Sequence, residues 1–277
     1  MKILGISGGM HSCGLAYLKD GKPEFAFEEE RFNRVRTYKD FYKDLFRFPY
    51  ECGQNVWYNK DFDWNELDYI TSHYSAKVTE EIWDGIGLGP FPKEKFIKTN
   101  HHRAHCSLAY YCSGFEEDTL VVSIDAMGEK YSARYFIGSN GNLTDIGKIS
   151  DEFKSLGHYY AMLTEFLGFR RLKDEGKVVG TASHGKFNKD FYNVFNECIT
   201  IDGIKTDKDN GKVISGGIYE DFYKLWFEKH GSKFSSHLKN DIAYNGQLVF
   251  EEKILEIFNN LWKKHPNLRK VALAGGV

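Results

Sequence analysis

Three short runs of strand-forming residues open the chain, at residues 2–7, 13–19 and 24–27. Turn residues separate them, because Gly8-Gly9 follows the first run and Asp20-Gly21-Lys22 follows the second. Short glycine-containing connections between such runs are typical of β-hairpins. The sequence therefore predicts that the fold begins as an antiparallel meander.

Strands and helices mix in the rest of the chain. Further strands are expected at 69–73, 96–99, 120–124, 131–137, 143–149 and 270–274. Helical spacing of apolar residues occurs near 41–53, from residue 101, and at 157–167, 177–184, 219–230 and 246–264. A polar, glycine-rich stretch at 188–241 is expected to be a surface insertion. This mixture predicts an α/β fold with mixed sheets.

The charge balance limits the classes of partner. Among 277 residues, 37 Lys and Arg nearly cancel 39 Asp and Glu, so the basic field that supports non-specific nucleic-acid binding is absent. No apolar run reaches the roughly 18 residues that a membrane span needs. The five cysteines include no Cys-x-x-Cys pair of the kind found in zinc ribbons. We therefore expect a cytoplasmic protein without nucleic-acid or membrane partners.

Two histidines four positions apart are the sharpest local signal. His101 and His105 lie on a predicted helix, so their imidazoles share one face and can bind one metal ion. The same stripe continues into the apolar residues Leu108, Ala109 and Cys112. Two hydrogen-bonded core histidines are therefore the alternative interpretation, because buried imidazoles usually have such partners.

Asp125 strengthens the metal interpretation. It directly follows the predicted buried strand 120–124, and α/β proteins bind ligands at the carboxyl ends of strands. Two imidazoles and one carboxylate form a suitable ligand set for zinc, iron or manganese. The alternative is an aspartate that only caps the next turn.

Three further segments have features of an anion site. Gly8-Gly9 joins the first two predicted strands, and glycine allows close approach of the backbone to a phosphate. Gly128-Glu129 marks a tight turn whose N–H groups can meet an anion. Lys177 lies close to glycines in the sequence, although the chain has no Walker phosphate loop. Ordinary turns are the alternative.

Charged residues gather after the third predicted strand. The members of this cluster are Glu28, Glu29, Glu30, Arg31, Arg34 and Arg36. Considered alone, such a run indicates a solvated face.

Taken in order, these motifs resemble one family, the carbamoyltransferases of the NodU/CmcH/TobZ group. The resemblance covers essentially the whole chain. It rests on residues 3–7 with His11, and on 28–34, 101–105, 124–129, 155–157, 174–177 and 273–277. Because several spaced motifs must coincide, the resemblance is far more specific than any one of them.

The resemblance implies an ASKHA fold (actin-like ATPase and ribonuclease H-like) with two lobes and mixed sheets. The first lobe is expected at 1–150 and an incomplete second lobe at 151–277. The implied enzyme transfers a carbamoyl group from carbamoyl adenylate to a hydroxyl of a small-molecule acceptor. A YrdC-like C-terminal domain makes that adenylate from ATP and carbamoyl phosphate in the family.

The resemblance also implies roles for individual residues. His101, His105 and Asp125 match the ligands of the active-site metal, which is iron in the family. The transfer site would contain His11, with Arg31 and Arg36 near the anionic intermediate. The residues implied in cofactor binding are Gly8, Gly9, Gly128, Glu129, Lys177, Gly275 and Gly276.

The chain also departs from the family pattern. Ser12, Ala126 and Arg36 stand where the family usually has Asp, Gly and Lys. The sequence stops before the family's nucleotide-contacting helix, a fourth metal ligand and the YrdC-like domain. We therefore expect one half of a split or truncated enzyme, with the YrdC-like half as a partner. A non-catalytic remnant that binds a nucleotide or a partner is the alternative, whereas a sugar kinase or ATPase of the same fold is disfavoured.

Overall fold

The computed structural model describes residues 1–8, 13–34, 49–59, 62–149, 155–204 and 236–277. The chain forms two compact units, Met1–Asn100 and His101–Val277. The expected lobe boundary at residue 150 therefore differs from the observed division and falls inside the second unit. The physical reason is strand pairing, because the strands between residues 119 and 149 share one sheet with Lys270–Ala274.

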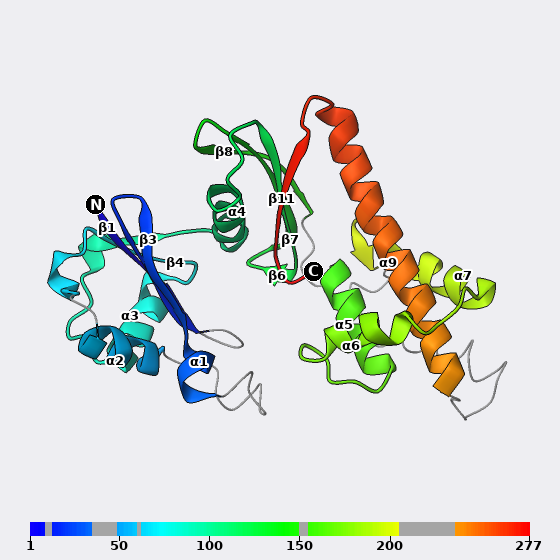
Figure 1. Cartoon of the computed structure of the whole chain (residues 1–277), viewed down its shortest axis with the longest axis horizontal. Helices are drawn as coiled ribbons and strands as arrows, with labels where there is room; N and C mark the ends of the chain where they lie inside the picture. Colours follow the sequence, from blue (N-terminus) through cyan, green and yellow to red (C-terminus); the bar gives the residue numbers. More distant parts are fainter. Residues whose placement is uncertain (9–12, 35–48, 60–61, 150–154, 205–235) are drawn as a thin grey trace. The chain divides into compact units, whose positions relative to one another are not determined.

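The first unit is built on a five-stranded sheet in the order β3-β2-β1-β4-β5 (Figure 1). Its strands are β1 (Lys2–Ser7), β2 (Gly14–Lys19), β3 (Lys22–Glu28), β4 (Tyr69–Ser72) and β5 (Phe96–Lys98). The first three strands pair antiparallel, which confirms the predicted meander. β4 pairs parallel with both β1 and β5, so the sheet is mixed.

Aromatic rings fill much of the core of this unit. The helical elements described here are α1 (Glu29–Asn33), α2 (Tyr50–Asn59), α3 (Ala76–Ile86) and the short 3-10 turns η1 (Trp64–Glu66) and η2 (Lys93–Lys95). Successive edge-to-face contacts, with ring centroids 4.7 to 5.8 Å apart, join Phe25, Phe62, Trp64, Trp83 and Phe91. This packing explains part of the high aromatic content of 16%.

Glu29, one of the clustered charges, is buried rather than solvated. Only 5% of the residue is exposed, and its two carboxylate oxygens accept hydrogen bonds from the backbone N–H groups of Glu51 and Cys52, each at 2.9 Å. These donors belong to the first turn of α2, where N–H groups have no partner inside the helix. Glu29 therefore caps α2 from a distant part of the sequence.

Replacing Glu29 by alanine is expected to lower the free energy of unfolding by about 1–2 kcal/mol, the usual cost of losing a helix cap. Urea unfolding of the full chain measures the change. Glu28→Ala is the matched control, because Glu28 is exposed and pairs only with exposed Arg31 among the interactions described. A loss for Glu29→Ala no larger than for Glu28→Ala would show that the cap contributes nothing.

The second unit contains a four-stranded sheet in the order β11-β6-β7-β8. The strands are β6 (Thr119–Gly128), β7 (Tyr131–Ser139), β8 (Asn142–Ile149) and β11 (Lys270–Ala274). β6 pairs parallel with β11 and antiparallel with β7. The expected α/β class with mixed sheets is thereby confirmed.

Helices cover both faces of this sheet (Figure 1). The helices described in this unit are α4 (His101–Tyr111), α5 (Leu156–Phe166), α6 (Glu175–Ala182), α7 (Lys189–Cys198) and α9 (Ser236–Lys264), and it also contains a small hairpin of β9 (Ile199–Thr200) and β10 (Gly203–Ile204). Val121 belongs to the hydrophobic cluster that contains α4 residues, whereas its neighbours Leu120 and Val122 belong to the larger cluster that contains residues of α5, α6, α7 and α9. Successive β6 side chains thus serve two separate cores. Within the described ranges, no helix is both long and apolar enough to cross a membrane.

Part of the expected surface insertion at 188–241 belongs to the hydrophobic core of the second unit. α7 buries Phe191, Val194 and Phe195, which repeat at helical spacing on one face. The polar residues between them masked this pattern in the sequence. The expected helix at 219–230, and most of the one at 41–53, lie outside the described residues.

Candidate metal centre

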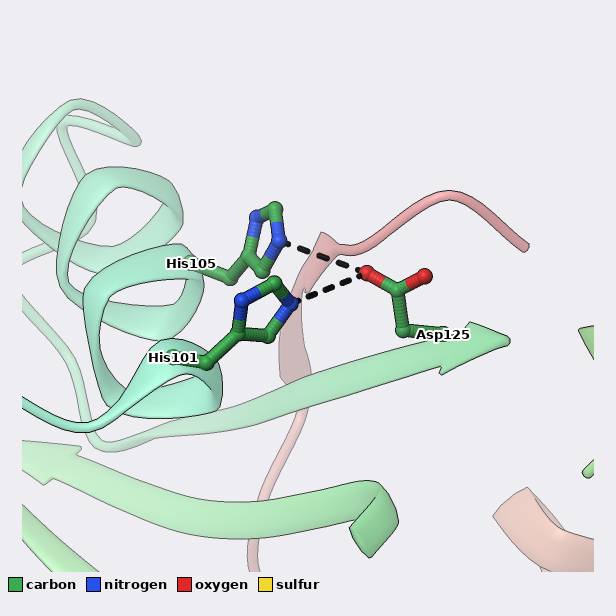
Figure 2. Close-up of side chains that lie close together, drawn as sticks. All are labelled: His101, His105 and Asp125. Atoms are coloured by element: carbon green, nitrogen blue, oxygen red, sulfur yellow. Dashed lines mark hydrogen bonds and ion pairs between the residues drawn. The ribbon is translucent and has the colours of Figure 1, made fainter. Parts of the chain in front are cut away.

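Two imidazoles and a carboxylate converge in the second unit. His101 Nε2 and His105 Nε2 each lie 3.3 Å from Asp125 Oδ2 (Figure 2). One ligand atom from each of the three residues lies within 4.8 Å of the others. The side chains are 20%, 37% and 18% exposed, so the cluster is reachable from solvent.

The strand places Asp125 at an irregular position. Pairing of β6 with β7 shifts register between Ile124 and Gly128. Such a bulge bends the strand and redirects the side chains within it. Asp125 therefore lies beside the first turns of α4, as Figure 2 shows.

The rotation of α4 differs from the predicted one. The buried residues are His102, Cys106 and Tyr110, whereas Leu108 is 67% exposed and Cys112 is also exposed. Of the predicted stripe only Ala109 packs against the core, and it is partly buried, so the prediction of an apolar core face is wrong for Leu108 and Cys112. His101 and His105 occupy the flank of the helix, and the core-histidine alternative describes His102 instead.

His102 is a buried polar residue of α4 that the sequence pattern did not single out. It is fully buried, with Nδ1 2.9 Å from Ser123 Oγ and Nε2 2.9 Å from the Tyr131 carbonyl oxygen. Burial lowers the pKa of His102 below its usual value. The sequence contains a signal for this buried face, because His102 lies four residues before Cys106 and eight before Tyr110, so the three side chains share one side of a helix.

Asp125 is held as a carboxylate. Burial alone would raise its pKa, but hydrogen bonds from His101 and His105 and from the Ala126 N–H oppose this and hold the pKa well below the usual range. The Ala126 N–H donates to Oδ1 at 2.7 Å, which leaves Oδ2 to face the histidines. An ionised oxygen beside two imidazole nitrogens is a ready acceptor for a cation.

Glycines allow the backbone to approach this cluster closely. A Cβ on Gly128 would lie 2.5 Å from His101 Cδ2, and one on Gly276 would lie 3.3 Å from Asp125 Oδ1. Gly275 has φ +105° and passes so near the Ile124 carbonyl oxygen that a Cβ would lie 2.0 Å from it. The structure therefore brings these three expected cofactor-binding glycines to the cluster. Glu129 follows Gly128 in the turn, is exposed and has φ +66°.

The other predicted site residues that the structure describes each have a place within one of the two units. Lys177 Nζ lies 3.1 Å from Asp174 Oδ1, at the start of α6. Arg31 lies in the first unit, where it pairs with Glu28 at 3.2 Å. Gly8 lies after β1 in that same unit. The remaining predicted residues, Gly9, His11 and Arg36, lie outside the described residues.

The donor set fits a divalent transition metal. Imidazole nitrogen and carboxylate oxygen suit zinc, iron and manganese, and three protein ligands leave positions for substrate or water. Both Nε2 atoms already face one carboxylate oxygen, so a cation can replace the hydrogens between them. The fold and site therefore define an α/β protein with a candidate His-His-Asp metal centre beside a central strand.

The sequence places this protein in a family. Residues 73–277 match the family described as carbamoyltransferase N-terminus. The chain belongs to this family, in agreement with the resemblance seen in its motifs.

Two curated relatives show the extent of similarity. Protein MJ1051 of Methanocaldococcus jannaschii, described as uncharacterized, is 30% identical over 277 residues, covering 99% of this chain and 50% of that protein. Nodulation protein NolNO of Sinorhizobium fredii is 24% identical over 312 residues, covering 100% of this chain and 44% of that protein. The chain thus spans about half the length of these relatives.

Solved structures also match the chain. Full-length HypF in its phosphate- and nucleotide-bound form has 13% identity and a TM-score of 0.47, covering 99% of this chain and 48% of HypF. MreB 5 of Spiroplasma citri bound to AMPPNP has 10% identity and a TM-score of 0.38, covering 99% and 84% of the two chains. Both TM-scores lie below 0.5, so the ASKHA fold stays an expectation from the family resemblance and is not argued from these superpositions.

Proposed function

We propose that this chain is the transfer domain of an O-carbamoyltransferase. In this proposal it passes a carbamoyl group from carbamoyl adenylate to a hydroxyl of a small-molecule acceptor. The observation that carries the proposal is the convergence of His101, His105 and Asp125 in a member of the carbamoyltransferase N-terminal family.

The reaction makes one bond and breaks another. The acceptor oxygen attacks the carbamoyl carbon, the bond from that carbon to the phosphoryl oxygen breaks, AMP leaves, and the hydroxyl proton passes to a base. His101, His105 and Asp125 would hold the divalent metal, iron by the family resemblance. Bound there, the metal supplies positive charge that stabilises the anionic leaving group. Asp125 stays ionised and keeps the two imidazoles turned toward the site.

Cations of the chain would complete the anion site. Roles for Arg31 and Lys177 in binding the anionic intermediate are proposed on family grounds, and each has a carboxylate partner within its own unit. Gly128 brings backbone close to the His101 ring, and Gly276 brings backbone close to the Asp125 carboxylate. Roles for His11 and Arg36 in the transfer site remain part of the proposal on family grounds.

The donor requires a second activity. We infer that a YrdC-like part, in the same protein or in a separate cytoplasmic chain, makes carbamoyl adenylate from ATP and carbamoyl phosphate. The length of the curated relatives supports this proposal, since each has room for a further domain beyond the matched half.

Metal binding and transfer can be tested separately. The full chain is expected to bind a single Fe²⁺ or Co²⁺ ion under anaerobic dialysis, and His105→Ala is expected to lose this binding. A transfer assay then combines the metal-loaded chain, a separately expressed YrdC-like domain, ATP, carbamoyl phosphate and a panel of hydroxyl compounds. A chain that neither retains metal nor releases AMP in response to any acceptor would instead support the non-catalytic remnant.

A further inference from the structure

His102 contacts two strands through its ring nitrogens. The Tyr131 carbonyl oxygen can only accept a hydrogen bond, so Nε2 carries the hydrogen and donates at 2.9 Å. In the neutral ring, Nδ1 then has a lone pair and accepts from the Ser123 hydroxyl at 2.9 Å. Both nitrogens are therefore engaged within the protein, and His102 has no atom available as a metal ligand.

These two contacts fix α4 to the strands around Asp125. Ser123 lies two residues before Asp125 on β6, and Tyr131 begins β7 after the intervening turn. A helix tied at His102 to both strands cannot rotate without breaking a buried hydrogen bond, which is costly. Because His101 is adjacent and His105 is one turn further, the tie also fixes the directions of their rings.

Gly128 ends β6 at the turn into β7, and this turn packs against the rings of His101 and His102. A Cβ there would lie 2.5 Å from His101 Cδ2 and 2.6 Å from His102 Nε2, so the backbone of the turn lies against both rings. Gly128 does not have a positive φ, so its backbone conformation does not require glycine. Glycine is required because a Cβ at this position would clash with the two rings. The same turn therefore contacts one candidate ligand and the residue that anchors the helix.

We propose that His102 is a positioning residue which, together with Ser123 and Gly128, aligns His101 and His105 with Asp125 before a metal binds. This inference rests on the proposed metal site. Groups that orient metal ligands without touching the metal commonly change affinity by about 10- to 100-fold. His102 performs this task through the helix backbone.

Co²⁺ binding to the full chain tests the proposal, with equilibrium dialysis for affinity and visible absorption for coordination geometry. His102→Ala is expected to raise the Co²⁺ Kd by about 10- to 100-fold and to change the absorption spectrum. His102→Gln is expected to restore part of the affinity, because its amide NH₂ group can donate a hydrogen bond and its amide oxygen can accept one. Gly128→Ala is expected to weaken binding by displacing the His101 ring.

Cys106→Ala is the matched control. Cys106 is also fully buried on the same face of α4, one turn from His102. This variant is expected to lower the melting temperature while leaving the Co²⁺ Kd and spectrum unchanged. If it weakens binding as much as His102→Ala does, general loosening of the helix explains the effect and the proposal is overturned.

The remaining outcomes separate the two proposals. Normal Co²⁺ affinity and spectrum in His102→Ala would overturn the positioning role and leave the metal site intact. Failure of the unmodified chain to bind any metal would overturn the metal site and the positioning role with it. Should His102→Ala not fold, Ser123→Ala decides, because it keeps the ring and removes one of its two hydrogen bonds; unchanged binding in that variant would contradict the proposal.

Discussion

Changing Asp125 to asparagine is expected to raise the Co²⁺ Kd of the chain by at least about 100-fold. Changes next to metal ligands already cost about 10- to 100-fold, and this substitution removes the negative charge of a ligand itself. The asparagine amide can also turn its N–H₂ group toward the imidazoles, where the carboxylate Oδ2 now lies 3.3 Å from both. Isothermal titration calorimetry of Co²⁺ into the metal-free chain measures the change.

Asp118→Asn is the control for this experiment. Asp118 is exposed and directly precedes β6, so the variant makes the same chemical change at the opposite end of the same strand. Its Co²⁺ affinity is expected to equal that of the unmodified chain. Equal affinities for all three proteins would show that bound metal resides elsewhere.

Changing Phe136 to alanine is expected to lower the free energy of unfolding by about 3–5 kcal/mol, the usual cost of deleting a buried phenylalanine. Phe136 is fully buried in the small core between α4 and the sheet, together with Cys106 and Tyr110. The guanidinium groups of Arg103 and Arg134 also lie over its ring, with Cζ 5.9 and 5.2 Å from the centroid. For a unit of this size the melting temperature should fall by roughly 10 °C.

Leu108→Ala is the informative comparison. Leu108 lies on α4 but is 67% exposed, so its truncation is expected to change the free energy of unfolding by no more than about 0.5 kcal/mol. Differential scanning calorimetry of both variants measures the contrast. A loss for Leu108→Ala as large as for Phe136→Ala would show that α4 packs through the apolar stripe predicted from the sequence.

The sequence was sufficient to predict the cluster and the strands of the two main sheets, but not the short hairpin of β9 and β10. Alternating strand-formers and glycine turns predicted β1, β2 and β3 within one or two residues of their observed ends. The spacing of His101 and His105, with Asp125 at the end of an apolar run, predicted which side chains meet. Both signals are local, because they depend on the period of a helix or strand and on the residues that end it.

The rotation of α4 about its own axis could not be predicted from such local signals. Helical spacing shows which residues share a face, but not which face packs on the sheet. Hydrophobicity favoured Leu108 and Cys112, whereas the observed core face contains His102, whose polar nitrogens are satisfied by a serine and a carbonyl far away in sequence. The boundary between the two units at residue 100 also could not be predicted from local sequence patterns. It depends on pairing between β6 and β11, which are far apart in the sequence.

That long-range pairing also affects how the protein is made. β6 carries Asp125, yet one of its two edges is covered only when β11, which lies far along the chain from β6, has been synthesised. Until then, the unpaired edge of the apolar strand β6 can pair with strands of other chains. Contacts between residues so far apart in the sequence also form slowly. Newly synthesised chains should therefore complete the sheet beside Asp125 only after β11 has been made, so assistance by chaperones is most valuable in the interval between synthesis of the two strands.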